Sequence, residues 1–239
     1  FHMGNAAEMC ARECKIPRES PQDEFALLSY QRALKAQEKG WFKEEIIPVP
    51  VKSKKEELIV QEDEEPKKVK FDKIRSLRPA FEKDGTVTAA NASKINDGAA
   101  AVLIMSRKKA EELGLTPMAK IISYSTAAKD PEWFTTAPAD AIDQLLNKTG
   151  LSHTDIDLFE INEAFAVVSL AVNQLLGLDV EKVNIAGGAV ALGHPIGASG
   201  ARILTTLLFN LKRTQKKKGI ASLCIGGGEA VAVLIEMLW

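Results

Sequence analysis

The sequence predicts an α/β fold of the layered type, in which βαβ units build a mixed sheet that helices cover. Two observations predict it. From residue 116 onward, apolar runs of strand length alternate with longer amphipathic runs of helix length. Three motifs with unusual chemistry each follow directly on an apolar run, at the carboxyl ends of strands where open α/β sheets place ligands. A chain of 239 residues, 46% of them apolar, can bury the core of such a domain.

The N-terminal part opens with two predicted helices. They span residues 5–14 and 20–39, and Ser20 is the expected N-cap of the second. Residues 45–51 favour β structure, but two prolines limit them to an edge strand or an extended segment. Residues 52–73 carry dense charge of both signs. We interpret them as a solvated excursion, with a lysine clamp for phosphate as the alternative.

The middle of the chain is richer in small and apolar residues. Residues 99–105 form an apolar run typical of a buried strand. Ser106 is then expected to cap a short helix that ends at Gly114.

Regular alternation follows to the end of the chain. The predicted strands are residues 118–126, 157–161, 183–186, 219–225 and 229–237. The predicted helices are residues 138–149, 163–176 and 199–213.

Composition excludes several classes of function. A net charge of −1 gives no reason to expect a nucleic acid or an anionic membrane as partner. No apolar run approaches the ~20 residues of a transmembrane helix. The three cysteines, at positions 10, 14 and 224, do not form a disulfide framework and favour a reducing compartment. Cys10 and Cys14 have helical spacing without further ligands, so we expect a structural pair and no metal site.

The strongest motif is the glycine-rich run 187–200, which contains His194. Its glycines allow tight turns and close approach of a substrate, and the run ends where a helix begins. A lone histidine is more often structural, but this setting favours a catalytic role for His194.

Two further motifs complete the set. Cys224 ends a hydrophobic strand and is followed by Ile225-Gly226-Gly227-Gly228, so the N–H of Gly226 could point at a reacting carbonyl oxygen. Inert packing is the alternative for Cys224. Asn162, in the motif Asn162-Glu163-Ala164-Phe165, could cap a helix, orient a reactant, or do both. A thiol, an imidazole, an amide and backbone donors together suit acyl-thioester chemistry.

In this order and spacing the three motifs resemble the thiolase family, and its acetyl-CoA acetyltransferase (acetoacetyl-CoA thiolase) branch in particular. The resemblance runs from Phe1 nearly to Trp239. It implies a thiolase-like layered fold, coenzyme A thioesters as substrates and no tightly bound cofactor. It also implies condensation of two acetyl-CoA to acetoacetyl-CoA plus coenzyme A, and the reverse thiolysis.

The resemblance also implies roles for individual residues. Cys224 would take a proton from the α-carbon of acetyl-CoA, and His194 would polarise the thioester oxygen and activate a nucleophilic cysteine. Asn162 would orient a water at the first oxyanion site, and Gly226 would serve the second. The positions that would contact coenzyme A are Met3, Leu77, Phe81, Ala89, Ser93, Ala164 and Phe165.

By the same resemblance we expect the chain to lack the N-terminal domain with the nucleophilic cysteine, and to be inactive alone. Residues 1–95 would then cover coenzyme A, 96–115 would return to the missing domain, and 116–239 would form the C-terminal domain. Expected partners are acetyl-CoA or acetoacetyl-CoA, the missing half, and further copies in a dimer or tetramer. A cytoplasmic location is expected, with mitochondria as the alternative. The other functions considered are a degradative 3-ketoacyl-CoA thiolase and a non-catalytic subunit for coenzyme A binding or assembly.

Overall fold

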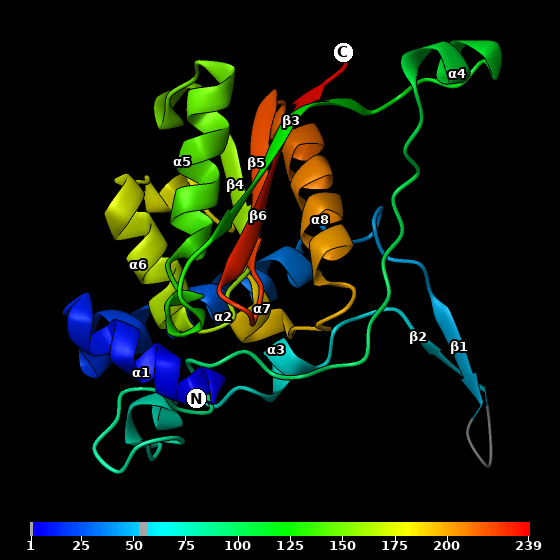
Figure 1. Cartoon of the computed structure of the whole chain (residues 1–239). Helices are drawn as coiled ribbons and strands as arrows, with labels where there is room; N and C mark the ends of the chain where they lie inside the picture. The colour runs from blue at the N-terminus through cyan, green and yellow to red at the C-terminus, as the bar shows by residue number, and fades with distance from the viewer. Residues whose placement is uncertain (1, 53–56) are drawn as a thin grey trace.

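A four-stranded mixed sheet forms the centre of the chain in a computed structural model, which describes residues 2–52 and 57–239 (Figure 1). The strand order is β3-β6-β5-β4. The strands are β3 (Ala119–Ala128), β4 (Leu158–Ile161), β5 (Lys218–Cys224) and β6 (Glu229–Met237). β6 pairs antiparallel with both β3 and β5, whereas β5 and β4 are parallel. The predicted layered α/β fold with a mixed sheet is confirmed.

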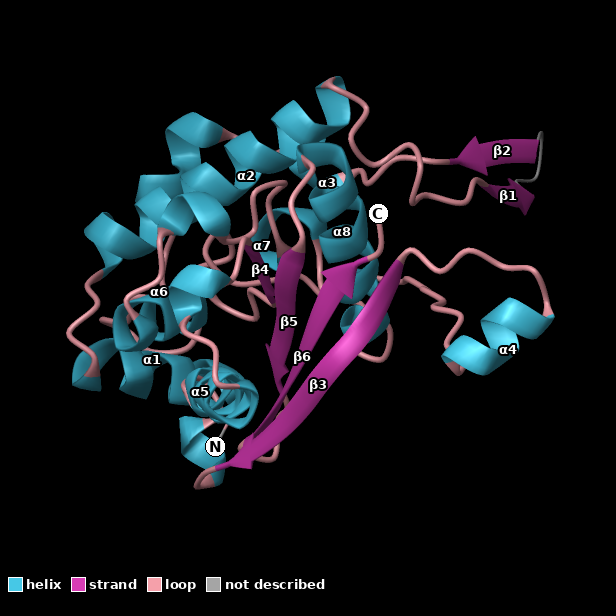
Figure 2. Cartoon of the chain, turned by 90° about the horizontal axis from the view of Figure 1, so that it is seen from above, coloured by secondary structure: helices cyan, strands magenta, loops and turns pink. Residues whose placement is uncertain are grey.

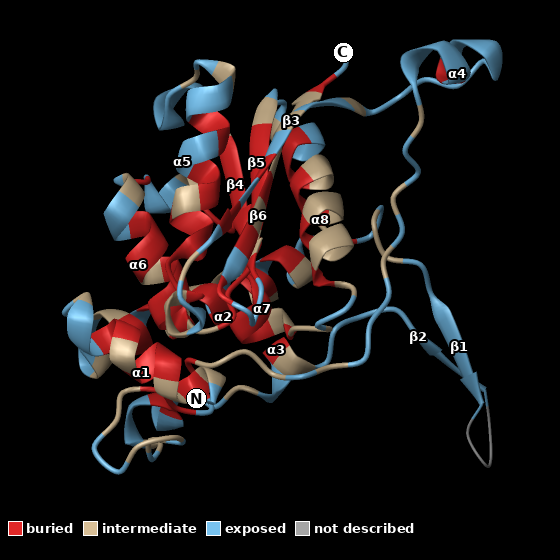
Figure 3. Cartoon of the chain, viewed as in Figure 1, coloured by how far each residue is buried: buried red, intermediate tan, exposed pale blue. Residues whose placement is uncertain are grey.

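Two helices cover opposite faces of this sheet, as Figures 1 and 2 show: α5 (Ala137–Thr149) and α8 (Ser199–Thr214). Alternate strand residues face them, because side chains of a strand point to opposite sides. Phe159 packs in the cluster that contains the apolar face of α5. Its neighbour Leu158 packs with Leu207 of α8. The two cores lie on either side of the strands, where Figure 3 shows the buried residues.

A further group of helices gathers where β4 and β5 end (Figure 1). It comprises α1 (Met3–Glu13), α2 (Asp23–Glu38), α6 (Ala166–Leu176) and the short α7 (Ala189–Leu192). α1 packs on α6, and α2 packs on α7. The N-terminal segments therefore cover the carboxyl ends of the parallel strands, where ligand sites are expected.

A β-hairpin and the short helix α4 (Arg107–Glu112) project from this body (Figure 3), whereas α3 (Glu65–Lys68) packs against α2 and α7. β1 (Val49–Lys52) and β2 (Glu57–Val60) form an exposed antiparallel hairpin, so the expected β segment near residues 45–51 is partly confirmed. α3 follows in the charged segment. Residues 53–56 of that segment lie outside the described residues. α4 is the short helix capped by the hydroxyl of Ser106, as expected.

The predicted buried strand at residues 99–105 is wrong. This segment is extended and pairs with no strand among the described residues. Leu103 and Ile104 are 81% and 65% exposed. An apolar run permits a strand, but a strand also needs a neighbour for its N–H and C=O groups.

The predicted strand at residues 183–186 is also wrong, because a side chain takes over the pairing. Val183 makes one isolated bridge to Phe159. Asn184 then has a positive φ of 47°. Its side-chain amide accepts from Ile161 N–H and donates to Ile161 C=O, both at 2.8 Å. The amide group of Asn184 thus pairs with the end of β4 as a peptide would.

Two helix starts differ from those predicted. α2 begins at Asp23 after a π-helical turn at Arg18–Gln22, and the Ser20 hydroxyl bonds the Glu24 carboxylate instead of capping the backbone. α6 begins at Ala166 with Phe165 as its N-cap residue. The segment from Asn162 to Phe165 is therefore outside the helix. Of the helices in residues 2–52 and 57–239, none has the length and apolar character required to cross a bilayer.

Candidate active site

The parallel pair β4 and β5 brings two of the motifs to one edge of the sheet. Ile161 at the end of β4 is in register with Ser222 of β5. The next N–H, that of Asn162, donates to the C=O of Ser222 at 2.9 Å. Cys224 is the last residue of β5. The amide and the thiol therefore leave neighbouring strands at the same end.

His194 reaches this edge through a strained turn after α7. Gly193, which ends α7, has a φ of +97°, a conformation that suits glycine. A Cβ at Gly193 would lie 2.2 Å from Oδ1 of Asn96, so only glycine fits. The N–H of His194 donates to the C=O of Lys94 at 2.8 Å. This hydrogen bond holds His194 next to the segment that contains Lys94.

Asn162 and His194 form a contact whose chemistry fixes the histidine tautomer. Nδ2 of Asn162 lies 3.4 Å from Nε2 of His194. An amide NH₂ group only donates, so Nε2 accepts and Nδ1 carries the proton. Nδ1 lies 2.6 Å from Oγ of Ser199, and that hydroxyl donates to the C=O of Pro195 at 3.1 Å. The hydrogen bonds therefore run in one direction from Asn162 to Pro195.

His194 is held in the neutral form. Burial lowers its pKa, and the positive charge of Arg202 lowers it further. A neutral imidazole with an unprotonated Nε2 is ready to accept a proton from a reacting group.

The side chain of Asn162 is buried, and its Oδ1 atom is an unpaired acceptor within the described residues. The residue is 1% exposed. The helix-capping alternative for Asn162 is ruled out, since α6 begins four residues later without a side-chain cap. A buried acceptor without a partner next to an imidazole suits a site that receives a polar reactant.

Cys224 lies in a packed apolar cluster. It packs in a cluster with the buried side chains of Phe134, Ala164 and Val168, and with Met3 and Phe165 at its edge. Burial raises the pKa of the Cys224 thiol to about 12. At neutral pH this residue is therefore a thiol, and its thiolate is a strong base.

The structure brings most of the predicted coenzyme A positions to this cluster. Met3, Ala164 and Phe165 touch the Cys224 cluster directly. Ser93 donates its N–H to the C=O of Ala164 at 3.1 Å, and the Phe81 ring lies edge-on to that of Phe165 at 6.2 Å.

The predicted oxyanion residue Gly226 and the other two predicted coenzyme A positions, Leu77 and Ala89, lie in different surroundings. Gly226 is exposed beside Met3, whose Sδ would lie 3.6 Å from a Cβ at Gly226. Leu77 packs in a different cluster, which contains Ala90. Ala89 is exposed next to Ala90.

Sequence reasoning missed the role of Glu163, which it placed in the first turn of a helix. Glu163 is 1% exposed and lies outside α6. Its carboxylate accepts from Oγ of Ser29 at 2.7 Å, Nδ2 of Asn184 at 3.0 Å and the N–H of Val190 at 3.1 Å. Gly188 lets this carboxylate approach, since a Cβ there would lie 2.2 Å from it. The signal was available, because Glu163 adjoins Asn162 in a motif already singled out.

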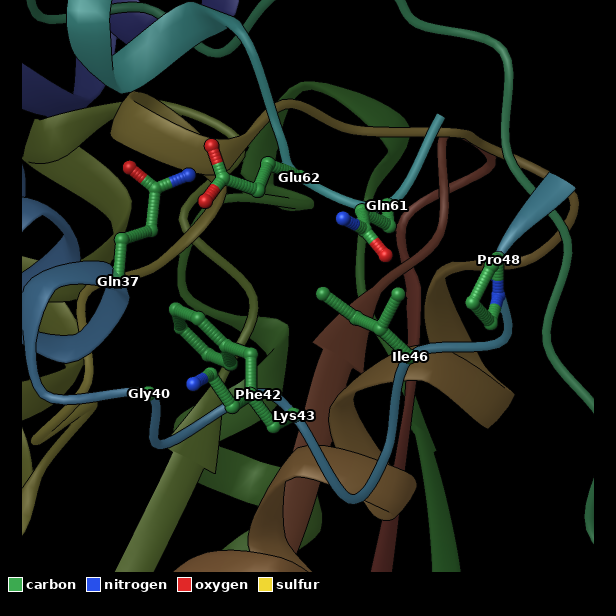
Figure 4. Close-up of a pocket in the computed structure, with 8 residues that line it drawn as sticks. All are labelled: Gln37, Gly40, Phe42, Lys43, Ile46, Pro48, Gln61 and Glu62. Carbon is green, nitrogen blue, oxygen red and sulfur yellow. The ribbon is translucent and has the colours of Figure 1, made fainter. Parts of the chain in front are cut away.

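Two cavities adjoin the N-terminal segments. One is a shallow, open depression of about 460 Å³ between residues 96–100 and 195–198, next to His194 in the chain. The other, of about 350 Å³, lies between the end of α2 and the base of the hairpin and is lined by Phe42, Lys43 and Ile46 among others (Figure 4). It contains none of the predicted site residues. No group of three or more metal-binding side chains occurs among residues 2–52 and 57–239.

The fold and this constellation are those of a thiolase-type acyltransferase scaffold, and comparison with known families agrees. The family model "Thiolase, C-terminal domain" matches residues 115–237, and "Thiolase, N-terminal domain" matches residues 1–108. The chain belongs to the thiolase family. The expectation that it lacks the N-terminal domain is wrong, because residues 1–108 match that domain. The expectation that the chain alone is inactive is not borne out by these matches.

Individual relatives extend the comparison. The chain is 52% identical to an acetyl-CoA acetyltransferase of Schizosaccharomyces pombe, over 98% of this chain and 60% of the relative. The crystal structure of the Bacillus anthracis acetyl-CoA acetyltransferase superposes with a TM-score of 0.96 at 50% identity, covering 99% of this chain and 60% of that one. Human mitochondrial 3-ketoacyl-CoA thiolase superposes with a TM-score of 0.91 at 42% identity, covering 98% and 59%. The chain thus spans about 60% of the length of the curated relative.

Proposed function

We propose that the full-length protein is an acetyl-CoA C-acetyltransferase, which condenses two acetyl-CoA to acetoacetyl-CoA and coenzyme A and catalyses the reverse thiolysis. The observation that carries the proposal is the contact of Asn162 with His194. It leaves a neutral imidazole with an unprotonated Nε2 at the sheet edge where Cys224 ends β5. The acetyl-CoA acetyltransferase relatives support coenzyme A thioesters as substrates.

In this proposal Cys224 moves the proton at the α-carbon. Because burial raises its pKa to about 12, the Cys224 thiol can protonate the carbanion that leaves in thiolysis. In condensation Cys224 first gives its proton to the coenzyme A thiolate that leaves the first acetyl-CoA, and the Cys224 thiolate so formed removes a proton from the methyl group of the second acetyl-CoA. The apolar surroundings formed by Phe134 and Val168 support this, since a dry pocket strengthens the thiolate as a base.

His194 and Asn162 serve the carbonyl oxygen and the acyl-accepting thiol. Nε2 of His194 accepts the proton of the nucleophilic cysteine that the family resemblance implies. The protonated Nε2 then stabilises the oxyanion of the thioester, together with a water oriented by Asn162. Cys10 is not suited to the nucleophilic role, because it is buried and its pKa is raised to about 12 by burial.

In this proposal Phe134 limits the length of the acyl chain that the site accepts. Its ring is 2% exposed and packs in the same cluster as Cys224. A large side chain here favours the acetyl group over longer chains. A degradative 3-ketoacyl-CoA thiolase is the second candidate, supported by the likeness to the human mitochondrial enzyme at a lower identity of 42%.

Thiolysis rates of the full-length protein distinguish these functions. We expect efficient thiolysis of acetoacetyl-CoA by coenzyme A and a decline in kcat/KM for longer 3-ketoacyl-CoA thioesters. An increase with chain length would favour the degradative enzyme. Binding of coenzyme A without turnover of any thioester would favour a non-catalytic subunit.

The remaining features of the full-length protein stay predictions. We propose a homo-oligomer, either a dimer or a tetramer, which analytical ultracentrifugation would test. We also propose a cytoplasmic location, with mitochondria as the alternative, and fractionation of cells would test it. The division into residues 1–95, 96–115 and 116–239 is likewise a proposal, which limited proteolysis would test.

A further inference from the structure

We propose that Lys94 is a positioning residue for His194, with its ammonium group fixing α7 and its backbone fixing the histidine itself. The part of this proposal that concerns turnover rests on the proposed function. The structural part does not, because it concerns the placement of the imidazole alone.

The ammonium group of Lys94 is held between two buried partners. Nζ donates to the C=O of Val190 at 2.9 Å and to the hydroxyl of Tyr30. It also lies 4.7 Å from the centre of the Tyr30 ring, a cation–π geometry. Tyr30 and Val190 are 3% and 0% exposed. Burial, followed by the charges of Glu65 and Glu163, raises the pKa of Tyr30 to about 12, so its hydroxyl is a neutral acceptor.

The ammonium group satisfies a carbonyl that the helix leaves free. In a continuing helix, Val190 C=O would accept from His194 N–H, four residues later. α7 ends at Leu192, and His194 N–H donates to Lys94 C=O instead, at 2.8 Å. The side chain of Lys94 then supplies the donor for Val190 C=O. A cation is favourable at the end of a helix, where carbonyl groups are unpaired.

Lys94 therefore holds both ends of the turn that presents the imidazole. Its side chain donates a hydrogen bond to Val190 C=O, and its backbone carbonyl accepts one from His194 N–H. Ile95 forms a parallel bridge with His194. On the opposite side, Glu163 accepts from the N–H of Val190 at 3.1 Å. Glu163 follows Asn162 directly. Val190 is thus the point through which the positions of Asn162 and His194 are coupled.

The test replaces Lys94 by Met, which keeps the length of the side chain and removes the donor. Lys148→Met is the matched control. Lys148 also donates to a backbone carbonyl, that of Tyr124 at 3.2 Å, and lies 5.1 Å from the Tyr124 ring, but in the last turn of α5. Both variants are made in the full-length protein, and His194→Gln identifies the NMR resonance of the His194 imidazole.

We expect Lys94→Met to lower kcat about tenfold to a hundredfold, with KM changed less than about threefold, because a displaced group loses orientation more than binding. The NMR titration curve of His194 should shift. Lys94→Arg should restore part of kcat, and added ammonium ions, but not tetramethylammonium, should partly rescue Lys94→Met. Lys148→Met should leave each of these properties as in the wild type.

The titration of His194 decides the proposal even if the protein catalyses another reaction, because it needs no turnover. The proposal would be overturned if Lys94→Met had the same His194 titration curve and the same kcat as Lys148→Met. If Lys94→Met does not fold, Tyr30→Phe removes one of the two acceptors and keeps the charge. It should then shift the same His194 resonance, and an unshifted resonance would overturn the proposal.

Discussion

The buried carboxyl group of Glu160 should make the protein less stable as the pH rises. Glu160 is 2% exposed on β4, and its Oε1 accepts from Nδ2 of Asn210 at 3.0 Å. Burial raises its pKa to about 8, although the charge of Arg202 opposes the shift. Glu45, whose pKa burial raises to about 7, acts in the same direction.

The sign follows from proton binding. The unfolded chain releases the Glu160 proton near pH ~4.3, whereas the folded chain keeps it to about pH 8. Between these values the folded state binds more protons, so the free energy of unfolding falls as the pH rises. Each pH unit in this window is worth about 1.4 kcal/mol per proton, which gives a loss on the order of 2 kcal/mol between pH 6 and pH 8.

Glu160→Gln should remove this loss, because the amide oxygen keeps the bond from Asn210 and the side chain has no proton to release. Urea unfolding followed by circular dichroism at pH 6, 7 and 8 measures the effect. We expect the variant to exceed the wild type by about 2 kcal/mol at pH 6 and by about 2 kcal/mol more at pH 8, because the two would match only below about pH 4.3, where the glutamate is protonated in the unfolded chain as well. Glu111→Gln, at the exposed surface of α4, is the control and should follow the wild type. A variant less stable than the wild type by a constant amount at every pH would show that Glu160 is ionised and paired with Arg202.

Three further changes probe the site. Phe134→Ala should reduce stability by about 3–5 kcal/mol and raise thiolysis of longer 3-ketoacyl-CoA thioesters relative to acetoacetyl-CoA, because it opens space beside Cys224. An unchanged substrate preference would contradict the role given to Phe134. Gly193→Ala should reduce the free energy of unfolding by about 1–3 kcal/mol from backbone strain alone, since a Cβ would meet Asn96 at a φ of +97°. The melting temperature and kcat should both fall. Cys10→Ala should leave acyl transfer from acetyl-CoA intact, as measured by intact-protein mass, and loss of the acyl adduct would make Cys10 the acceptor.

The parts of the fold that depend on local patterns could be predicted from the sequence. β6 and α8 lie within one residue of their predicted bounds, and the Ser106 cap of α4 is present. Apolar alternation, helical periodicity and capping residues act over short distances, so they are readable without a fold.

The two wrongly predicted strands lie where residues distant in the sequence determine the backbone pairing. The segment 183–186 has the composition of a strand, but the side chain of Asn184 takes the hydrogen bonds of Ile161. The apolar run 99–105 finds no strand to pair with among the described residues.

The candidate site divides in the same way. Motifs identified Asn162, His194 and Cys224, because their residue types are chemically distinctive. The contacts of Lys94 with Tyr30 and Val190 join residues 64 and 96 positions apart, and no local pattern reports them.

The central claim is that Cys224 is the base at the α-carbon, and exchange of the methyl protons of acetyl-CoA with heavy water tests it most directly. The full-length protein should catalyse this exchange. Cys224→Ala should slow it by about 10²–10⁴-fold, the usual contribution of a general base. Cys224→Ala should still form the acyl-enzyme, whereas His194→Gln should impair both steps. Exchange by Cys224→Ala at the wild-type rate would contradict the account, since another group would then remove the proton.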